Sequence, residues 1–144
     1  MSKYMQGKYQ IRNPEKYVGK GIPTYRSSWE LTFMNFCDNN PNVLQWASEA
    51  IHVPYRNPFT GKNTIYVPDF MIIYADANGK RHGEVVEIKP LKETMLESAV
   101  SQRDKAMVAL NMYKWDAARK FCAAQGLRFR IINEGDIYHQ GKKR

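Results

Sequence analysis

The sequence predicts a single α/β domain in which helices cover both faces of a mixed β-sheet. At 144 residues, the chain has the length of one domain with its own hydrophobic core. Along the chain, the spacing of apolar residues is first helical, then strand-like over several short segments, then helical and finally strand-like again. We therefore expect an α+β core with the order αβββαβ, preceded by a basic N-terminal arm.

The first predicted helix lies in the segment SSWELTFMNFCDNN, residues 27–40. Ser27 is placed to cap its N-terminus, and Pro41 follows the two asparagines that end it. Apolar side chains recur near the helical period of 3.6 residues at Trp29, Phe33, Phe36 and Cys37. Such a stripe indicates that the helix packs against the sheet.

Three strand patterns and a turn follow this helix. Short patterns occur at NVLQWA (42–47) and AIHVPY (50–55), and a longer one spans residues 65–74. The DANGK turn then leads to a strand over residues 83–89, which Pro90 ends.

A second helical pattern and a last strand complete the predicted domain. Residues 93–125 have helical spacing, with an expected break near Asn111, and Gly126 is a typical C-terminal stop. The segment LRFRII is the last predicted strand. We expect the folded domain to cover residues 26–135, and residues 136–144 to form a basic, solvated tail.

Positive charge gathers at the N-terminus of a chain whose formal net charge is +8. One acid, Glu15, accompanies the cations that precede Glu30, which are Lys3, Lys8, Arg12, Lys16, Lys20 and Arg26. Clustered cations favour a polyanionic partner, either a nucleic acid or a membrane surface. No apolar run has the length of a membrane-spanning helix. We expect residues 1–25 to form the basic arm, with interleaved tyrosines that stack on bases or sugars (Tyr4, Tyr9, Tyr17 and Tyr25).

Cysteine and histidine spacing argues against a structural zinc site and against a disulfide framework. Cys37 and Cys122 have no CxxC partner, and the histidines are scattered along the chain. We expect two reduced, buried thiols. The polar start of the chain has no apolar stretch of the signal-peptide type, so an intracellular protein is expected.

The segment VPDFMIIYADANGKRHGEVVEIKP, residues 67–90, places three charged side chains in strands that otherwise look buried. Glu87 and Lys89 alternate on one strand and therefore share a face. A two-residue Asn-Gly turn would put Asp69 on the opposite face. A three-residue Ala-Asn-Gly turn, with Gly79 in the left-handed conformation, would instead pair Asp69 with Glu87. We expect this second register, which brings the three charges together beside an apolar surface.

This cluster of charges has two interpretations. Two adjacent carboxylates repel each other, and a divalent cation relieves the repulsion. Alternatively, Lys89 forms a purely structural ion cluster with Asp69 and Glu87 at the edge of the strands. The short motif by itself is compatible with both.

Pro68-Asp69 and Glu87-Ile88-Lys89 resemble the two halves of the PD-(D/E)xK nuclease motif. A closer resemblance runs through most of the chain, in GKYQIRNPEKYVGKGI, YRSSWELTF, NNPNVLQWASEAIHVPY, NPFTGKNTIYVPDF, VVEIKP and KWDAARKFCAAQGLRFRII. These strings look like the head completion nucleases of T-even-type bacteriophages, which are relatives of the catalytic domain of the TnsA transposon endonuclease. The resemblance implies a restriction-endonuclease-like core for the PD-(D/E)xK nuclease domain.

The resemblance also implies a metal-dependent site for phosphodiester hydrolysis. Asp69, Glu87 and the backbone carbonyl of Ile88 would bind Mg²⁺, for which Mn²⁺ would substitute. Lys89 would orient or help deprotonate the attacking water and offset charge in the transition state. Glu30 matches an acid that the family carries on its first helix, and would hold a second metal ion or its water shell.

Glu30, Glu49 and Tyr55 also have possible structural roles near this site. Ser27 and Glu30 also form a capping box, which by itself explains the glutamate. Glu49 and Tyr55 match a further stretch of the family, where we expect sheet packing and support of the site.

The implied function is cleavage of double-stranded phage DNA with little sequence preference, during head completion or head-to-tail joining. The location would be the virion or the host cytoplasm, with head, portal or neck proteins as partners and no membrane. The cations of the basic arm, with Arg26 nearest the site, would bind the DNA backbone. A non-enzymatic DNA-binding connector of the virion and a junction-resolvase-like nuclease are the alternatives. Exonucleolytic and endonucleolytic cleavage, and one and two metal ions, remain open at this point.

Overall fold

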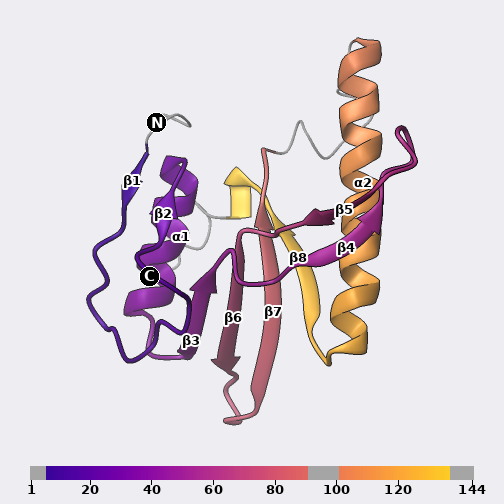
Figure 1. The fold of residues 1–144 in the computed structure, drawn as a ribbon. Helices are drawn as coiled ribbons and strands as arrows, with labels where there is room; N and C mark the ends of the chain where they lie inside the picture. Colours follow the sequence, from indigo (N-terminus) through magenta and orange to yellow (C-terminus); the bar gives the residue numbers. More distant parts are fainter. Residues whose placement is uncertain (1–5, 91–100, 137–144) are drawn as a thin grey trace.

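The computed structural model of the protein describes residues 6–90 and 101–136. The fold is built on a four-stranded mixed sheet (Figure 1). The strand order is β3-β6-β7-β8. Their bounds are Val43–Ser48 for β3, Phe70–Ala75 for β6, Arg81–Ile88 for β7 and Arg128–Ile132 for β8. Strand β6 is antiparallel to both β3 and β7, and β8 is parallel to β7. The expected mixed sheet is therefore confirmed.

One helix covers each face of this sheet. Helix α1 (Ser28–Asn39) shares a buried cluster with Phe70 and Ile132, whereas α2 (Gln102–Ala124) packs Trp115 against Phe129 and Ile131. Because side chains alternate along a strand, neighbouring residues 131 and 132 of β8 point to opposite faces. The predicted cap is also present, since Ser27 Oγ accepts a hydrogen bond of 3.1 Å from the Glu30 backbone N–H.

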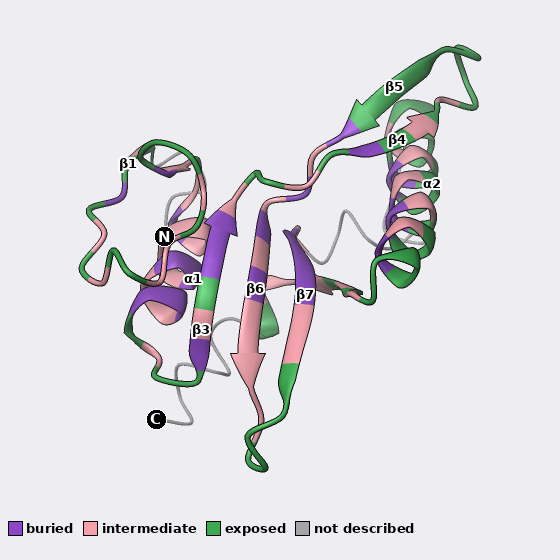
Figure 2. Ribbon diagram, turned by 60° about the horizontal axis from the view of Figure 1, so that its bottom comes forward, coloured by how far each residue is buried: buried purple, intermediate pink, exposed green. Residues whose placement is uncertain are grey.

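The long strand predicted over residues 65–74 is wrong, because it is two strands. Strand β5 (Asn63–Tyr66) pairs with β4 (Val53–Arg56) in a separate ribbon, and β6 begins only at Phe70. Pro68 lies in the gap, where it has no N–H to donate to a sheet. The core order αβββαβ is confirmed, with this ribbon inserted between β3 and β6. Figure 2 shows the ribbon projecting from the sheet with most of β5 exposed.

The break expected near Asn111 is also wrong, because α2 continues through this residue. Asn111 lies on the buried face of the helix, so its polarity does not mark a helix end. Gly126 does end the helix as predicted, with a φ of 74° and a bond of 3.2 Å from its N–H to the Ala123 carbonyl. The part of the helical prediction over residues 93–100 lies outside the described residues.

The N-terminal segment packs onto α1 and carries two short paired strands, β1 (Gly7–Lys8) and β2 (Thr24–Tyr25). Tyr9 is only 5% exposed, and the ring of Tyr17 lies with its edge against Trp46 at a centroid distance of 4.7 Å. The prediction that these two tyrosines stack on bases is therefore wrong. Their rings are part of the core, because a buried aromatic contributes more apolar area than most other side chains.

Asp38, in the last turn of α1, connects this segment to the helix. Its Oδ2 atom accepts hydrogen bonds from the Tyr9 hydroxyl at 2.7 Å and the Arg12 backbone N–H at 2.8 Å. Its Oδ1 atom accepts from the Asn13 backbone N–H at 3.0 Å. The fully buried carboxylate thus fixes the path of residues 9–13 over the helix.

Two smaller expectations concern the thiols and the membrane. Cys37 and Cys122 are both free and buried, as expected. Within the described ranges, no helix combines the length and apolar character that crossing a bilayer requires.

Candidate active site

The β6–β7 hairpin sets the register that brings the predicted acids together. Its turn has Gly79 at a φ of 80°, and the Asp76 N–H donates to the Lys80 carbonyl at 2.9 Å. The strands then pair from Ala75 opposite Arg81 to Phe70 opposite Val86. One further step places Asp69 opposite Glu87, so the predicted three-residue turn is confirmed.

Asp69 is held between the two neighbours of β6 at the point where this strand begins. Its Oδ2 atom accepts a hydrogen bond of 2.8 Å from the Ile88 backbone N–H, on the β7 side. Its backbone carbonyl accepts one of 2.9 Å from the Glu49 N–H, on the β3 side. The φ of Glu49 is 53°, an unusual value for a residue other than glycine. The backbone around Asp69 is thus fixed from both sides.

Pro68 explains how the Ile88 carbonyl can be a ligand. The hairpin register places Pro68 opposite Ile88, at a pair where an ordinary residue would donate its N–H to that carbonyl. Proline has no N–H, so β6 provides no such donor. The Ile88 carbonyl oxygen, which is predicted to bind a metal ion, therefore accepts no hydrogen bond from position 68 of the neighbouring chain segment.

Glu87 is a buried carboxylate with incomplete hydrogen bonding. The residue is 5% exposed, and its Oε1 atom accepts no hydrogen bond of good geometry, although the Tyr66 hydroxyl and the Asp69 N–H are near enough to lower its pKa. Its Oε2 atom lies 3.8 Å from Lys89 Nζ. A buried carboxylate oxygen without a hydrogen bond of good geometry is costly, and a bound cation would remove that cost. The predicted face is confirmed for Asp69, Glu87 and Lys89.

Burial and mutual repulsion act together on the two carboxyl groups. The pKa of Asp69 is raised well above its usual value by burial first, and then by the charges of Glu87 and Glu30. Burial also raises the pKa of Glu87, against the opposing effect of the Lys89 ammonium. Two such groups ionise together only when a positive charge lies between them or beside them. A divalent cation with oxygen ligands fits this requirement.

Glu30 accepts a hydrogen bond at the start of α1 and also lies close enough to Asp69 for its charge to act there. Its Oε1 atom accepts a hydrogen bond of 3.1 Å from the Arg26 backbone N–H, at the start of α1. Burial raises the pKa of Glu30, and its charge raises that of Asp69. The side chain therefore lies within electrostatic reach of the site while it caps the helix.

Among the described residues, the candidate metal site has two acidic side chains as ligands and not a complete set of protein ligands. No group of three or more His, Cys, Asp or Glu side chains in residues 6–90 and 101–136 is arranged to hold a metal ion. Mg²⁺ commonly binds through one or two carboxylates and keeps several waters, so Asp69 and Glu87 form a suitable site. The Lys89 side chain is 30% exposed, so the site can be reached from solvent.

Lys114, Tyr66 and Trp115 surround Glu87 and were missed in the sequence. Lys114 Nζ lies 5.0 Å from the centre of the Tyr66 ring. Burial and then the Lys89 ammonium lower the pKa of Lys114, which places both ammonium groups near Glu87. The Tyr66 hydroxyl lies near both Glu87 and the Trp115 indole, and burial, followed by the charge of Glu87, raises its pKa. A lysine next to the buried stripe of α2 was the available indication, but only packing shows which strand it meets.

The predicted DNA-binding cations have different environments. Lys8, Arg12 and Lys20 are exposed on the N-terminal segment, and Lys3 lies outside the described residues. Lys16 Nζ instead donates to the carbonyls of Asp38 at 3.0 Å and Asn40 at 2.7 Å, at the C-terminus of α1.

Arg26 and the two residues of the SE…PY stretch, Glu49 and Tyr55, differ in burial and in contacts. Arg26 forms an ion pair with Glu49, which is exposed, so the sheet packing expected for Glu49 is not observed. Tyr55 is half-buried and lies beside Tyr113 of α2, with ring centroids 6.4 Å apart. Packing was the expected role for Tyr55, and its position agrees.

One cavity of the protein lies away from these carboxylates. It has a volume of about 280 Å³ and is lined by Tyr74, Glu84 and Arg130, among others. Glu84 and Glu87 are an odd number of residues apart on β7, so their side chains point to opposite faces of the sheet. The cavity therefore lies on the face opposite to Glu87. The acids at the sheet edge are thus separate from it.

Comparison with known proteins identifies relatives of the chain. Residues 40–134 match the family described as TnsA-like endonuclease N terminal. Over 149 aligned residues, the chain is 34% identical to the head completion nuclease of Enterobacteria phage T4, with 95% of this chain and 96% of the relative covered. The family match includes Asp69, Glu87 and Lys89, but begins after Glu30.

Proposed function

Because the chain belongs to the TnsA-like endonuclease N-terminal family, with a restriction-endonuclease-like fold, we propose that it is a metal-dependent deoxyribonuclease. Its substrate is the phosphodiester backbone of double-stranded DNA. The relative named a head completion nuclease supports a role in phage head completion, with little preference for DNA sequence. The corresponding location is the virion or the host cytoplasm.

The convergence of Asp69 and Glu87 beside Lys89 is the observation that carries this proposal. The carboxylates lie on one face through an odd-numbered turn, and Glu87 keeps one buried oxygen that accepts no hydrogen bond of good geometry. Two adjacent carboxyl groups, both with a raised pKa, repel each other when ionised, and a cation bound between them would remove that repulsion. The arrangement thus favours a site that is completed by a cation and a substrate.

Asp69, Glu87 and the Ile88 carbonyl are the proposed ligands of Mg²⁺, and Glu30, whose charge acts on Asp69, is the proposed residue for its water shell or a second ion. When bound, the metal polarises a phosphate oxygen and lowers the pKa of a bound water, and Mn²⁺ has similar ligand preferences. Asp69 is aligned for this role by its hydrogen bond from the Ile88 N–H.

Lys89 supplies the positive charge on the substrate side. Its ammonium lies 3.8 Å from Glu87 Oε2 and is partly exposed, so it can reach both the carboxylate and an incoming phosphate. There it orients the attacking water and offsets the negative charge that develops on the phosphate oxygens. Lys114 adds a second ammonium near Glu87, at the α2 side of the site.

The N-terminal cations are the proposed contacts for flanking DNA. Lys8, Arg12 and Lys20 are exposed on the segment that packs over α1, beside the helix that carries Glu30. Lys3 is proposed on sequence alone. The engagement of Lys16 and Arg26 in the fold makes them weaker candidates, because a phosphate would have to compete with their present partners.

Cleavage of supercoiled plasmid in the presence of Mg²⁺ or Mn²⁺ tests the proposal. We expect the wild type to produce nicked and linear DNA, and EDTA to stop it. Lys89→Ala should be slower by about a hundredfold or more, the cost of removing one group that stabilises the transition state. Lys80→Ala is the matched control, because it removes an exposed lysine at the other end of the same hairpin.

Two outcomes would contradict the proposal. A wild type that leaves the plasmid intact in both metals would favour a non-enzymatic connector protein. Equal rates for the wild type and Lys89→Ala would show that any cleavage comes from another site or a contaminant.

A further inference from the structure

The β4–β5 ribbon presents a face that no other part of the described structure is seen to cover. Val53 and Tyr66 pair with each other and are buried with Trp115 of α2. Because side chains alternate, the next pair, Pro54 and Ile65, points away from α2, and Ile65 is 58% exposed. We call this side, with the loop that joins the strands, the outer face of the ribbon.

The loop at the tip of the ribbon holds an aromatic side chain in solvent on a backbone that is closed by hydrogen bonds. Asn57 Oδ1 accepts from the Phe59 N–H at 2.8 Å, and the Asn57 carbonyl accepts from the Gly61 N–H at 2.8 Å. The Asn57 N–H donates to the Lys62 carbonyl at 2.9 Å, which closes the loop. Phe59 is nevertheless 59% exposed. A pre-organised tip loses little entropy when its aromatic ring meets a partner.

The charge of the ribbon suits a polyanion. Residues 50–68 contain no aspartate or glutamate. Arg56 pairs with Asn63 on the outer face, and Lys62 lies at the end of the loop, both exposed. These cations flank Phe59 on both sides in the sequence, so an approaching phosphate chain meets positive charge and no acid.

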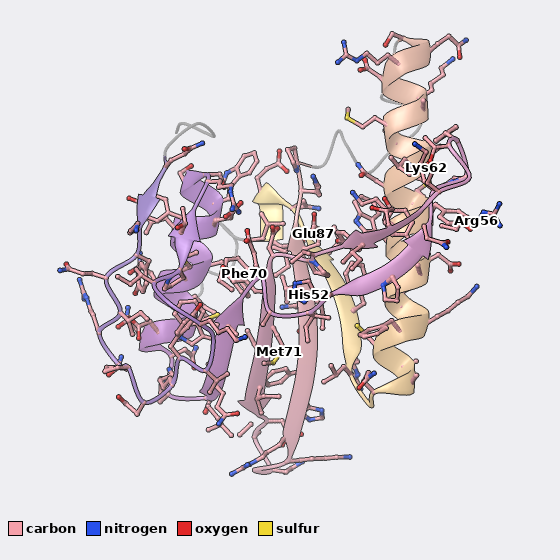
Figure 3. All side chains as sticks on the ribbon, viewed as in Figure 1. His52, Arg56, Lys62, Phe70, Met71 and Glu87 are labelled. Carbon is pink, nitrogen blue, oxygen red and sulfur yellow. The ribbon has the colours of Figure 1, made fainter. Side chains whose placement is uncertain are left out.

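The ribbon starts at the candidate active site and extends away from α1. Strand β5 ends at Tyr66, three residues before Asp69. In Figure 3, Arg56 and Lys62 lie at the far end of the ribbon from Glu87, on the side opposite to α1 and the N-terminal segment. Four residues of strand extend about 13 Å, the rise of roughly four base pairs. The site therefore lies between two positively charged surfaces.

We propose that the outer face of the β4–β5 ribbon binds the DNA duplex on one side of the cleavage position. Arg56 and Lys62 contact phosphates about four or more base pairs from the cleaved bond, and Phe59 packs against sugars and base edges in the groove between them. The inference rests on the proposed nuclease function, because that function makes DNA the partner. It assigns the opposite flank of the DNA to the N-terminal cations.

DNA binding by full-length variants tests this, in a Lys89→Ala background so that the duplex stays intact. The ribbon variant carries Arg56→Ala and Lys62→Ala. Its control carries Lys80→Ala and Arg81→Ala, which remove the same charge from the exposed β6–β7 turn at the opposite end of the sheet. Affinity for a 30-base-pair duplex is measured over a range of salt concentrations, and circular dichroism checks the fold of each variant.

We expect the ribbon variant to flatten the plot of log affinity against log salt by about 1.8, or about 0.9 for each phosphate that the protein no longer neutralises. The control should keep the parental slope. Phe59→Ala should lower affinity by about tenfold at unchanged slope, because it removes an uncharged group. If the ribbon variant behaves as the control does, the inference is overturned, and the face is left for a protein contact.

Plasmid cleavage by the same substitutions in the active chain separates this inference from the proposed function. A wild type that cleaves, together with a ribbon variant of unchanged salt slope, overturns the ribbon inference alone. A wild type that never cleaves overturns the nuclease proposal, while the salt slopes still decide whether the ribbon binds DNA.

Discussion

Asp38 and the pair Asp69–Glu87 are two buried acidic sites with opposite environments. Asp38 is fully buried and accepts hydrogen bonds from Tyr9, Arg12 and Asn13. Glu87 is almost as buried, yet one of its oxygens accepts no hydrogen bond of good geometry, and its neighbour is another acid. Burial is therefore common to both sites, and the supply of donors distinguishes them.

The pKa values express this difference. Burial alone would raise the pKa of Asp38, but the Arg12 N–H, the Tyr9 hydroxyl and Asn13 lower it below its usual value. At Asp69, burial and the neighbouring charges raise the pKa, and the single N–H of Ile88 does not compensate. A carboxylate with its donors thus stabilises the fold, whereas one without them is available for a ligand.

The largest expected effect comes from neutralising the pair. Asp69→Asn or Glu87→Gln should reduce plasmid cleavage by about a hundredfold or more, because a metal ligand is removed. Neither should destabilise the metal-free protein. Removing the repulsion should raise the melting temperature, by about 3 °C for each kcal/mol gained. Thermal unfolding beside the cleavage assay checks both parts, and a fall in melting temperature large enough to explain the reduced activity would refute the assignment.

The next effect is on stability and concerns the other site. Asp38→Asn puts an amide where four donors converge, so it should cost about 3 kcal/mol in the free energy of unfolding. Urea denaturation measures this cost. Cleavage per folded molecule should remain near that of the wild type. A stable Asp38→Asn protein would show that the two sites differ less than their hydrogen bonds indicate.

The pH dependence of stability should have opposite signs at the two sites. The pKa of Asp38 is lowered in the folded state, so its contribution is present above its unfolded pKa and is lost as pH falls. The pKa values of Asp69 and Glu87 are raised, so their contribution is present at low pH and is lost as pH rises through the folded values.

Metal-free urea titrations between about pH 2 and pH 7 separate these signs, because the Asp38 contribution is lost only below about pH 4. The stability advantage of Glu87→Gln over the wild type should grow as pH rises. The deficit of Asp38→Asn should shrink as pH falls. Parallel curves for the wild type and Glu87→Gln would mean that Glu87 is not strained by its charge.

The smallest expected effect is at Glu30, which combines features of both sites. Glu30→Gln can still accept the Arg26 N–H, so the melting temperature should change by only a few degrees. Cleavage should fall by about tenfold if the carboxylate also supports the metal and its waters. Full activity of Glu30→Gln would leave capping as its role.

The parts of the site that follow local rules were predictable from the sequence. The period of two along a strand placed Glu87 and Lys89 on one face, and turn geometry at Gly79 chose the face of Asp69. The first helix was predictable for the same reason, because Ser27 and its apolar stripe are local features. Local periodicity thus determined the hairpin that carries the acids.

The parts that depend on contacts distant in the sequence were not predictable. The strands β5 and β6 lie in one continuous apolar run of the sequence. They differ in their pairing partners and not in their composition, so the run gave no sign that the strand is interrupted at Pro68. Tyr9 was predicted to be a surface aromatic because cations surround it in the sequence. It can be buried because its hydroxyl donates to Asp38, a residue far along the chain. Lys114 meets Tyr66 only through packing of α2 on the ribbon. Spacing within one segment carries no information of this kind.

Calorimetric titration of the protein with Mg²⁺ or Mn²⁺ tests most directly that Asp69 and Glu87 form a cation site. Glu84→Gln is the control, since Glu84 is buried on the same strand and also has one oxygen without a hydrogen bond, but lies on the opposite face, with Tyr74 Oη at 3.1 Å and Arg130 Nε at 3.3 Å. We predict that the wild type and Glu84→Gln bind the metal and become more stable with it, and that Asp69→Asn and Glu87→Gln lose both responses. Equal metal affinity in all four proteins would contradict this account of the site.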